Sequence, residues 1–393
     1  MFSERIVKSL ASGSMIRAMF EQGNALKKLY GPENVYDFAL GNPDLEPSAE
    51  IIEDMKALVS QPDIHKYMAN AGHADVRQKI ADFMKNKTDV AFEARHIIMC
   101  TGAAAGLTIT MNSILNPGDE VIVIAPFFGE YRSYVTQYGG VIVPVRAIPG
   151  TFQLDIDAIG NAITAKTKAI IINSPNNPSG AVYPEEDLLK LNSVLLGAET
   201  KYGQPIYVVS DEPYVKVSYD NVQIPEVASI FDNAIIVNSF SKSLSLPGER
   251  IGYVAVNPLI KDSDILVDAL IYSNRTLGFV NAPSLFQKLV ADHLDDVVGL
   301  DSYKERRDVF YKILTDIGFE CTLPKGAFYL FVKSPIEDDG AFCDMALKHN
   351  IVIVSGKGFG YPGYFRIAYC VSMSQITGSK EAFAALYKEA TGK

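Results

Sequence analysis

Between about residues 95 and 257 the chain repeats one theme. A short apolar run rich in β-branched residues is followed by a Gly, Pro, Asn or Ser break and then by a longer stretch of helical character. Runs that are apolar on both faces are typical of parallel strands covered by helices on each side. The pattern predicts one large α/β domain with a mostly parallel, seven-stranded sheet between helices. The expected strands are 96–100, 121–125, 141–145, 169–173, 206–210, 235–238 and 252–256, and the expected helices include 103–115, 128–138, 184–200 and 259–273.

The C-terminal part of the chain has a different order of elements. We expect a long helix over 288–314, a strand over 328–332, a helix over 341–348, a strand over 364–369 and a final helix near 374–390. This order is typical of a smaller α+β domain, and the strand-like residues 36–40 would join it. The predicted division is a large domain over 46–285 and a small domain formed by both chain ends, 1–45 and 286–393.

Composition excludes several classes of protein. With 36 Lys and Arg against 46 Asp and Glu, the net charge of −10 argues against binding to nucleic acid or to an anionic membrane. The four cysteines are scattered without a Cys-x-x-Cys pair, and the five histidines include no His-Glu-x-x-His, so we predict neither a disulfide framework nor a metal site. No signal peptide or membrane span is expected, and a reducing cytoplasm is the simplest compartment.

The most informative stretch is 238–252, which reads NSFSKSLSLPGERIG. It places Lys242 just after an apolar run, among hydroxyl side chains and shortly before Arg250. A desolvated amine beside another cation has a lowered pKa and can attack a carbonyl group. A lysine on a solvated loop is the ordinary alternative, but it would not need such neighbours.

This stretch resembles the Schiff-base lysine motif of class I and II aminotransferases, which use pyridoxal 5′-phosphate (PLP) and have the aspartate-aminotransferase-like fold type I. The resemblance extends from Gly41 to Arg366. It implies that the large domain binds PLP and that Lys242 holds the cofactor covalently. It also implies that Lys242 is displaced by the incoming amino group and then acts as general base and acid.

Ser210 to Tyr214 follow another predicted strand, at the edge of the sheet where ligands bind. By resemblance, Asp211 pairs with the pyridine nitrogen, so that the ring can withdraw electrons from the reacting carbon. Tyr214 would hydrogen-bond the 3′-oxygen of PLP. The alternative is an Asp that caps a helix and a Tyr that packs in the core.

Two further turns match the family in order along the chain. Asn177, in the turn 174–180, would donate hydrogen bonds to the 3′-oxygen and to the substrate carboxylate; on composition alone this segment is simply a turn. Phe128 follows a predicted strand and would stack on the pyridine ring. Some relatives use Trp there, whereas this chain contains no Trp, and core packing is the alternative role for Phe128.

The phosphate group would bind at the strand-to-helix turn that begins at Thr101. Small residues there let a phosphate approach the free N–H groups and the positive end of the helix dipole. The backbone of Ala103 and Ala104 would hold the phosphate together with Ser239, Ser241 and Arg250. Many relatives have polar side chains at the two alanine positions, so this chain would rely on backbone groups and on Arg250.

Arg366 lies inside an apolar, strand-like run, and a buried arginine needs an anionic partner. By resemblance it binds the α-carboxylate of the amino acid, assisted by Gly41; a structural salt bridge is the alternative. Tyr67 matches the position at which the family supplies a tyrosine to the phosphate in the neighbouring subunit. The resemblance therefore implies a homodimer.

The expected activity is transfer of an amino group between an L-amino acid and a 2-oxo acid by a ping-pong mechanism. The alternative is a PLP-dependent β-lyase, decarboxylase or cyclopropane-carboxylate synthase on the same fold, because the cofactor residues are shared. A non-enzymatic alternative is the sensor domain of a PLP-binding transcription regulator. It is disfavoured because the α/β pattern begins too early to leave room for a DNA-binding domain.

The substrate is less constrained by the sequence. Enzymes of this family that prefer dicarboxylates use a second arginine from the partner subunit, and the alignment places Ala269 at that position. Arg17 and Arg275 are possible substitutes, although solvated surface charges are the simpler interpretation. We therefore expect aromatic or broad specificity, with glutamate and 2-oxoglutarate as one pair.

Overall fold

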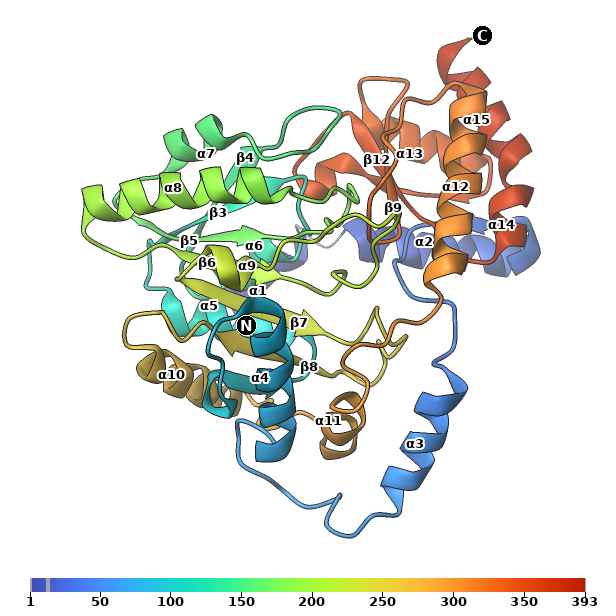
Figure 1. Ribbon diagram of the computed structural model, residues 1–393. Coiled ribbons are helices and arrows are strands. Elements are labelled where there is room, and N and C mark those ends of the chain that lie inside the picture. Colours follow the sequence, from blue (N-terminus) through green and yellow to red (C-terminus); the bar gives the residue numbers. More distant parts are fainter. Residues whose placement is uncertain (1, 12–14, 393) are drawn as a thin grey trace.

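The computed structural model describes residues 2–11 and 15–392, and its centre is a seven-stranded sheet in the order β2-β8-β7-β6-β5-β3-β4 (Figure 1). Strands β3 to β7 pair in parallel with their neighbours, whereas β8 is antiparallel to both β2 and β7. The predicted mostly parallel sheet is therefore confirmed. The strands are β2 (Ile97–Cys100), β3 (Glu120–Ala125), β4 (Val141–Arg146), β5 (Thr167–Ile172), β6 (Tyr207–Asp211), β7 (Ala234–Ser239) and β8 (Gly252–Val256).

Strand β4, at one edge of the sheet, is less buried than its prediction. The strands β5, β7 and β8 inside the sheet bury side chains on both faces, as their β-branched composition suggests, and so does β2 at the opposite edge. In β4, by contrast, Val141 is 48% exposed and Val145 is the buried residue. Pro144 lies in the middle of this strand, which an edge position tolerates because only one neighbour needs its N–H groups.

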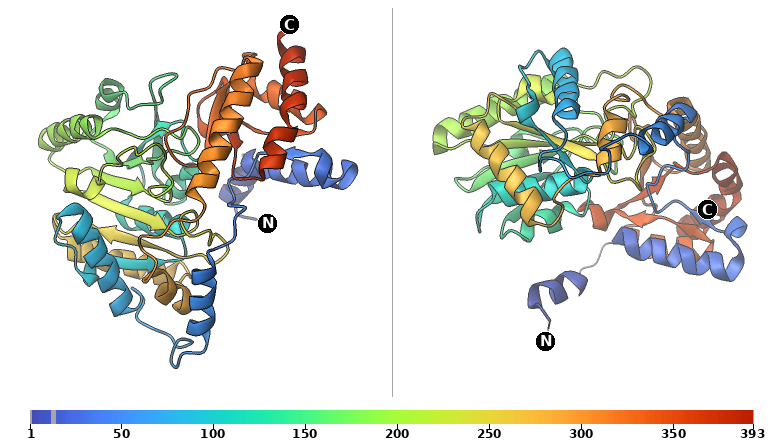
Figure 2. Two further views of the ribbon diagram at one scale, coloured as in Figure 1. Left: turned by 45° about the vertical axis from the view of Figure 1, so that its right-hand side comes forward. Right: turned by 90° about the horizontal axis from the view of Figure 1, so that it is seen from below.

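Helices lie on both sides of this sheet (Figure 2). Helix α5 packs against β7 and β8, and α10 packs against α5. In α8 the buried residues Leu188, Leu191 and Leu195 recur at helical spacing, which gives the helix one apolar face. The helices of this part are α3 (Ala49–Val59), α4 (Ala74–Thr88), α5 (Ala103–Ile114), α6 (Tyr131–Thr136), α7 (Ile156–Ala162), α8 (Glu185–Tyr202), α9 (Val227–Ile230), α10 (Ser263–Thr276) and α11 (Ser284–Val290), with the short turn η2 (Ala94–His96).

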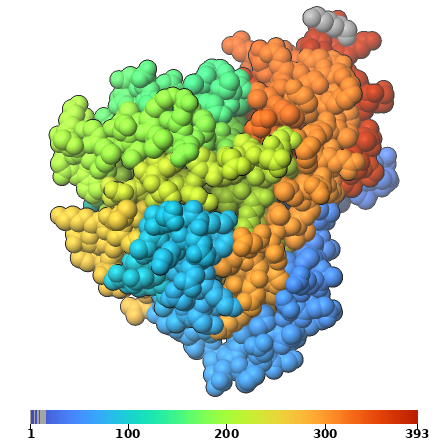
Figure 3. Space-filling view, in the orientation of Figure 1, coloured from blue at the N-terminus to red at the C-terminus, as the bar shows by residue number. Residues whose placement is uncertain are grey.

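A second, aromatic-rich core is formed mainly by the C-terminal residues, which lie at the upper right of Figure 3. Its sheet has the order β11-β12-β9 and is antiparallel, and β1 near the N-terminus pairs with β10. The two chain ends therefore meet, as expected. The remaining elements of the described chain are α1 (Glu4–Ala11), α2 (Met15–Tyr30), η1 (Pro32–Asn34), β1 (Tyr36–Asp37), α12 (Leu300–Ile317), β9 (Tyr329–Lys333), α13 (Asp339–Lys348), β10 (Ile351–Val352), β11 (Val354–Ser355), η3 (Gly356–Phe359), β12 (Tyr364–Ala368), α14 (Met373–Gly378) and α15 (Lys380–Thr391).

The predicted long helix over 288–314 is wrong. Helix α11 ends at Val290, and α12 begins after Gly299, whose φ of 72° is a left-handed conformation that suits glycine. Between them, His293 bonds Asp296 (2.6 Å) and Asp54 of α3 (3.0 Å), so the intervening loop is fixed by side-chain contacts. The final helix is also divided, into α14 and α15 at Ser379.

Among the residues described, none of the helices combines the length and the apolar character that a membrane crossing requires. Residues 1, 12–14 and 393 of the predicted small domain lie outside the described part of the chain. The division into domains over 46–285, and over 1–45 with 286–393, stays a prediction.

Candidate active site

A cavity of about 260 Å³ lies at the end of the sheet where β5, β6 and β7 finish. Loops at the carboxyl ends of parallel strands commonly form ligand sites, and here β12 and the N-terminus of α5 complete the walls. Nearly all of the residues selected from the sequence line this one cavity: Gly41, Ala103, Ala104, Phe128, Asn177, Asp211, Tyr214, Ser239, Ser241, Lys242, Arg250 and Arg366.

Lys242 lies in the loop after β7, and its Nζ donates a hydrogen bond to the carbonyl oxygen of Gly41 (2.7 Å). Burial lowers the pKa of Lys242 to about 8, and the charges of Arg366 and Arg250 act in the same direction. Phe328 adds an aromatic face 5.5 Å from the ammonium group. Near neutral pH this amine is therefore far more nucleophilic than a surface lysine.

Asp211 ends β6 and is 5% exposed. Its Oδ2 accepts a hydrogen bond from the hydroxyl of Tyr131 (2.6 Å), whereas its Oδ1 is buried without a partner among the described residues. Burial raises the pKa of Asp211 to about 6, and the hydrogen bond from Tyr131 opposes that rise. A buried acceptor of this kind is suited to a donor supplied by a bound molecule.

Arg366 projects from β12 and is 1% exposed. It donates to Asn177 Oδ1 (3.1 Å) and to the carbonyl of Ala39, and its guanidinium lies 4.6 Å from the ring centroid of Tyr329. No carboxylate of the described chain forms an ion pair with it, and its Nε has no hydrogen-bond partner there. The alternative of a structural salt bridge is therefore wrong, and the charge calls for an anionic ligand.

The other end of the cavity is suited to an anion. Gly102, with a φ of 82°, precedes α5, and no side chain from residues 2–11 or 15–392 caps the first turn of this helix. Ala103 and Ala104 of that turn, whose N–H groups have no partner within the helix, line the cavity together with Arg250, Ser239 and Ser241. A Cβ at Gly102 would lie 2.7 Å from Nη2 of Arg250, so the glycine lets the guanidinium approach the turn.

Aromatic residues form the remaining walls. Phe128 is only partly buried and lines the cavity, which favours a contact role over simple core packing. The hydroxyl groups of Tyr214 and Tyr329 lie 2.9 Å apart and share a hydrogen bond. A Cβ at Gly41 would collide with the Tyr329 hydroxyl, which explains the glycine at that position.

Tyr131 and Tyr329 were missed by the sequence analysis. Tyr131 follows Phe128 by three residues at the start of α6, and that spacing places the two rings near each other, 5.8 Å apart in an edge contact. This three-residue spacing could have identified Tyr131 from the sequence. Tyr329 comes from β9, which is distant in sequence, and no local pattern marks it.

Tyr67 and the substrate-specificity candidates lie away from this cavity. Tyr67 is 94% exposed, so within one chain it contacts no part of the cleft. Arg17 pairs with Glu21 on the exposed surface of α2, and Arg275 lies 5.6 Å from the ring of Tyr272. Ala269 lines a separate surface cavity beside α10.

The cleft fits PLP on three counts. The unpartnered oxygen of Asp211 can accept a hydrogen bond from a ring N–H, and the α5 N-terminus with Arg250 can bind a phosphate. Lys242 lines the same cleft, and its Nζ is the amine there that can attack an aldehyde. Arg366 remains free for the carboxylate of an amino acid.

Comparison with known proteins agrees with this geometry. The sequence model of the family described as aminotransferase class I and II matches residues 33–382. An aspartate aminotransferase of Bacillus subtilis is 32% identical over 365 residues, which cover 87% of this chain and 88% of that protein. An aspartate/prephenate aminotransferase of Thermus thermophilus is 30% identical over 88% of this chain and 89% of its own.

Solved structures show the same relation over nearly the whole chain. An amino transferase from Eubacterium rectale matches with a TM-score of 0.95 and 42% identity, over 99% of both chains. The aspartate aminotransferase of Thermus thermophilus with maleate matches with a TM-score of 0.88 and 26% identity, over 98% of this chain and 99% of the other.

Proposed function

The chain belongs to the family of class I and II aminotransferases and is a PLP-dependent enzyme of fold type I; from this premise we propose a role for each residue of the cleft. The observation that carries the proposal is the set of unsatisfied groups around one cavity. Lys242 is a desolvated amine. Among the residues that the structure describes, Asp211 has a buried oxygen without a partner, and Arg366 is a buried cation without a counter-ion.

The cofactor would be held at three points. Asp211 would accept a hydrogen bond from the pyridine N–H, and Tyr131 keeps the carboxylate oriented and ionised. The phosphate would be bound by the cavity-lining residues Ala103, Ala104, Ser239, Ser241 and Arg250. Phe128 would contact the ring, and Tyr214 and Asn177 would hydrogen-bond its 3′-oxygen. When bound, PLP supplies an electron-withdrawing ring that stabilises negative charge on the α-carbon of the amino acid.

The substrate would be positioned by Arg366, whose planar fork binds the α-carboxylate with help from Asn177 and the backbone of Gly41. Tyr329 fixes the guanidinium from one face, at 4.6 Å. Nζ of Lys242 would remove the proton from the α-carbon of the substrate and hold it as an ammonium group until it is transferred. Burial lowers the pKa of this lysine to about 8, so near neutral pH its amine can both accept and release a proton.

We further propose glutamate and 2-oxoglutarate as one substrate pair and a broad or aromatic choice for the other. Leu40, Leu107 and Phe128 give the cleft apolar walls, and in the described part of the chain its lining includes no arginine besides Arg250 and Arg366. The curated relatives are named for aspartate and prephenate, so aspartate belongs in the comparison.

Two proposals concern the whole protein. The enzyme is a homodimer in which Tyr67 reaches the phosphate site of the neighbouring subunit, and its exposure of 94% in the single chain is consistent with this role. It works in the cytoplasm, in keeping with four cysteines that are all free.

A panel of half-reactions tests the proposal. Holoenzyme is mixed with aspartate, glutamate, phenylalanine, tyrosine or alanine without an oxo acid, and conversion of the cofactor to pyridoxamine phosphate is followed by absorbance. Addition of 2-oxoglutarate should then produce glutamate and restore the starting spectrum. Release of ammonia and pyruvate without glutamate would indicate a lyase instead.

A further inference from the structure

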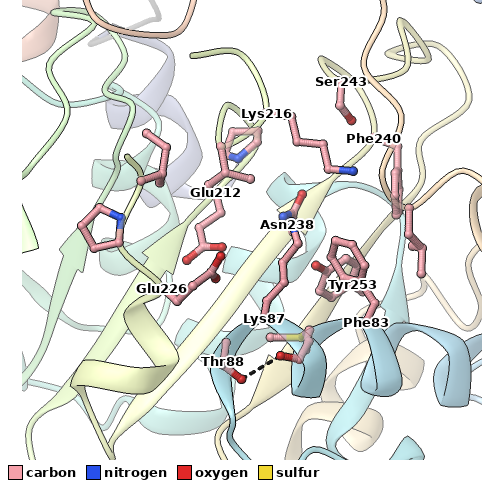
Figure 4. A pocket seen from close by; sticks show the side chains of 16 residues that line it. Phe83, Lys87, Thr88, Glu212, Lys216, Glu226, Asn238, Phe240, Ser243 and Tyr253 are labelled. Carbon is pink, nitrogen blue, oxygen red and sulfur yellow. Dashed lines mark hydrogen bonds between the residues drawn. The ribbon is translucent and has the colours of Figure 1, made fainter. Parts of the chain in front are cut away.

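A second cavity, of about 180 Å³, lies behind the active-site cleft. Its walls include Glu212, Asn238 and Ser243, the sequence neighbours of cleft residues Asp211, Ser239 and Lys242. Because side chains alternate between the two sides of an extended segment, one stretch of chain can serve both cavities. Pro213 lines both, and the end of α4 forms the far wall (Figure 4).

One side of the cavity is positively charged. The ammonium groups of Lys87 and Lys216 lie 4.4 Å and 5.3 Å from the ring centroid of Phe83. Burial lowers the pKa of Lys216 to about 8, and the charge of Lys87 acts in the same direction. Within the described residues Lys216 forms no ion pair, and the one ion pair of Lys87 is a 4.0 Å contact with Asp295. The negative charges of Asp295 and Asp296 oppose the lowering of the Lys216 pKa, but neither residue is in the described lining of the cavity, so the two cations converge on this side of it without a lining carboxylate beside them.

The opposite side is acidic. Figure 4 shows the carboxyl groups of Glu212 and Glu226 directed toward each other. Burial raises the pKa of Glu212 to about 8, and the negative charge of Glu226 contributes in the same sense. Neither carboxyl group forms an ion pair with any residue in the described ranges. Asn238 and Tyr253 add polar groups between the two sides.

The two lysines and the two carboxyl groups line one cavity without meeting across it. Direct ion pairs would form if the side chains collapsed together, yet no lysine nitrogen comes within 4.0 Å of either glutamate in the described structure. Burial disfavours the ionised form on both sides, so a ligand with an anionic group for the lysines and a cationic group for the carboxyl groups would stabilise the ionised form of each. We propose that the cavity binds a small zwitterion, with its carboxylate at Lys87 and Lys216 and its ammonium group at Glu212 and Glu226.

The size of the cavity agrees with such a ligand. A volume of about 180 Å³ corresponds to about six water molecules, which is enough for a small amino acid. The site is separate from the one at Arg366, because Arg366 and Lys242 line the other cavity. A bound zwitterion would contact the segments that carry Asp211 and Lys242, so its binding is coupled to the cofactor site through shared backbone.

Calorimetric titration of the holoenzyme tests this assignment. The probes are glycine, β-alanine and 4-aminobutyrate, which differ in the spacing of their two charges, with acetate and ethylamine as single-charge controls. Lys216→Met and Glu226→Gln are compared with wild type and with Lys201→Met. Lys201 is the matched control, because its ammonium group also lies over an aromatic ring, 4.9 Å from Tyr202, but outside the cavity.

We expect at least one zwitterion to bind wild type and Lys201→Met equally and the two cavity variants about tenfold more weakly, since each variant removes a hydrogen bond to a charged group. The probes can also bind at the active site, but that binding is the same in all four proteins and does not affect the comparison. Equal binding of the probes to all four would overturn the proposal, as would acetate binding as tightly as every zwitterion. Unchanged visible absorbance and turnover in Lys216→Met and Glu226→Gln separate this result from misfolding and from failure of the proposed function.

Discussion

At the scale of single residues, the active site is defined by charged groups whose partners the protein itself does not provide. Arg366 and Lys242 are cations in a cleft with one acidic side chain, Asp211, in the described lining, and that carboxylate bonds Tyr131 instead. A protein that kept these groups only for stability would lose free energy by burying them unpaired. Their arrangement is therefore best explained by ligands that carry a carboxylate, a phosphate and a ring N–H.

The lowered pKa of Lys242 predicts how the apoenzyme takes up its cofactor. The neutral amine is the reactive form, and its fraction increases as pH rises through about 8. The rate at which PLP absorbance develops should therefore increase with pH, with a midpoint near 8. A midpoint near the ordinary lysine pKa of about 10.4 would show that burial does not act on this amine.

Tyr131 predicts a second pH effect, on the affinity of the apoenzyme for PLP. Its hydrogen bond lowers the pKa of Asp211, so Tyr131→Phe should raise that pKa above about 6. Because the ionised carboxylate binds the pyridine N–H, PLP affinity in the variant should fall off at a pH about one unit higher than in wild type. Equilibrium dialysis between pH 5 and 8 measures this shift.

Tyr183→Phe is the control for that experiment. Tyr183 is also buried, but it lies outside the cleft. Removal of the Tyr183 hydroxyl should leave the pH dependence of PLP binding unchanged. An equal shift of that pH dependence in both variants would contradict a specific role for Tyr131.

Single residues also show which parts of the active site could be predicted from the sequence. Lys242, Asp211 and Asn177 were found because each belongs to a short local motif after a strand, and the structure places all of them in one cavity. Tyr329 escaped because its approach to Gly41 depends on the packing of β9 against a segment almost three hundred residues earlier. Contacts of that kind have no local signature.

At the scale of elements, the turn before α5 combines a strained backbone with an open helix N-terminus. Gly102→Ala would place a Cβ 2.7 Å from Nη2 of Arg250 and would force alanine to a φ of 82°. We expect a loss of about 1–2 kcal/mol in unfolding free energy from the backbone, together with about tenfold weaker PLP binding as Arg250 is displaced. Chemical denaturation and cofactor titration measure the two effects.

Gly278→Ala separates those effects. Gly278 has a similar φ of 91°, but a Cβ there would meet no atom of the described residues within 4 Å. This variant should lose similar stability and keep its PLP affinity. Equal loss of affinity in both variants would mean that the turn before α5 does not bind the phosphate.

The positions of elements with a strong apolar pattern could be predicted from the sequence. The ends of elements that are set by contacts with distant residues could not. The β-branched runs became strands close to their expected bounds, because burial on both faces demands that composition. The segment 288–314 has helical character throughout, yet the bonds of His293 to Asp54 and Asp296 and the left-handed Gly299 divide it. Asp54 belongs to α3, which no local reading of 288–314 includes.

At the scale of the whole molecule, the proposed homodimer makes each active site a product of two chains. Mixing Lys242→Ala subunits with Tyr67→Ala subunits tests this arrangement. A mixed dimer has one site with both Lys242 and Tyr67 and one site with neither, so tight PLP binding and turnover should exceed those of either variant alone. A fully active species of 43.0 kDa in sedimentation would contradict the proposal.

The central claim is that Lys242 carries the cofactor in the cleft between β6, β7 and β12. Reduction of the holoenzyme with borohydride fixes PLP to the amine that holds it, and peptide mass spectrometry then locates the added pyridoxyl group. We predict one group per chain, on Lys242, and none in Lys242→Ala, which should also lack aminotransferase activity. A group on another lysine, or amino-group transfer retained by Lys242→Ala, would contradict the account.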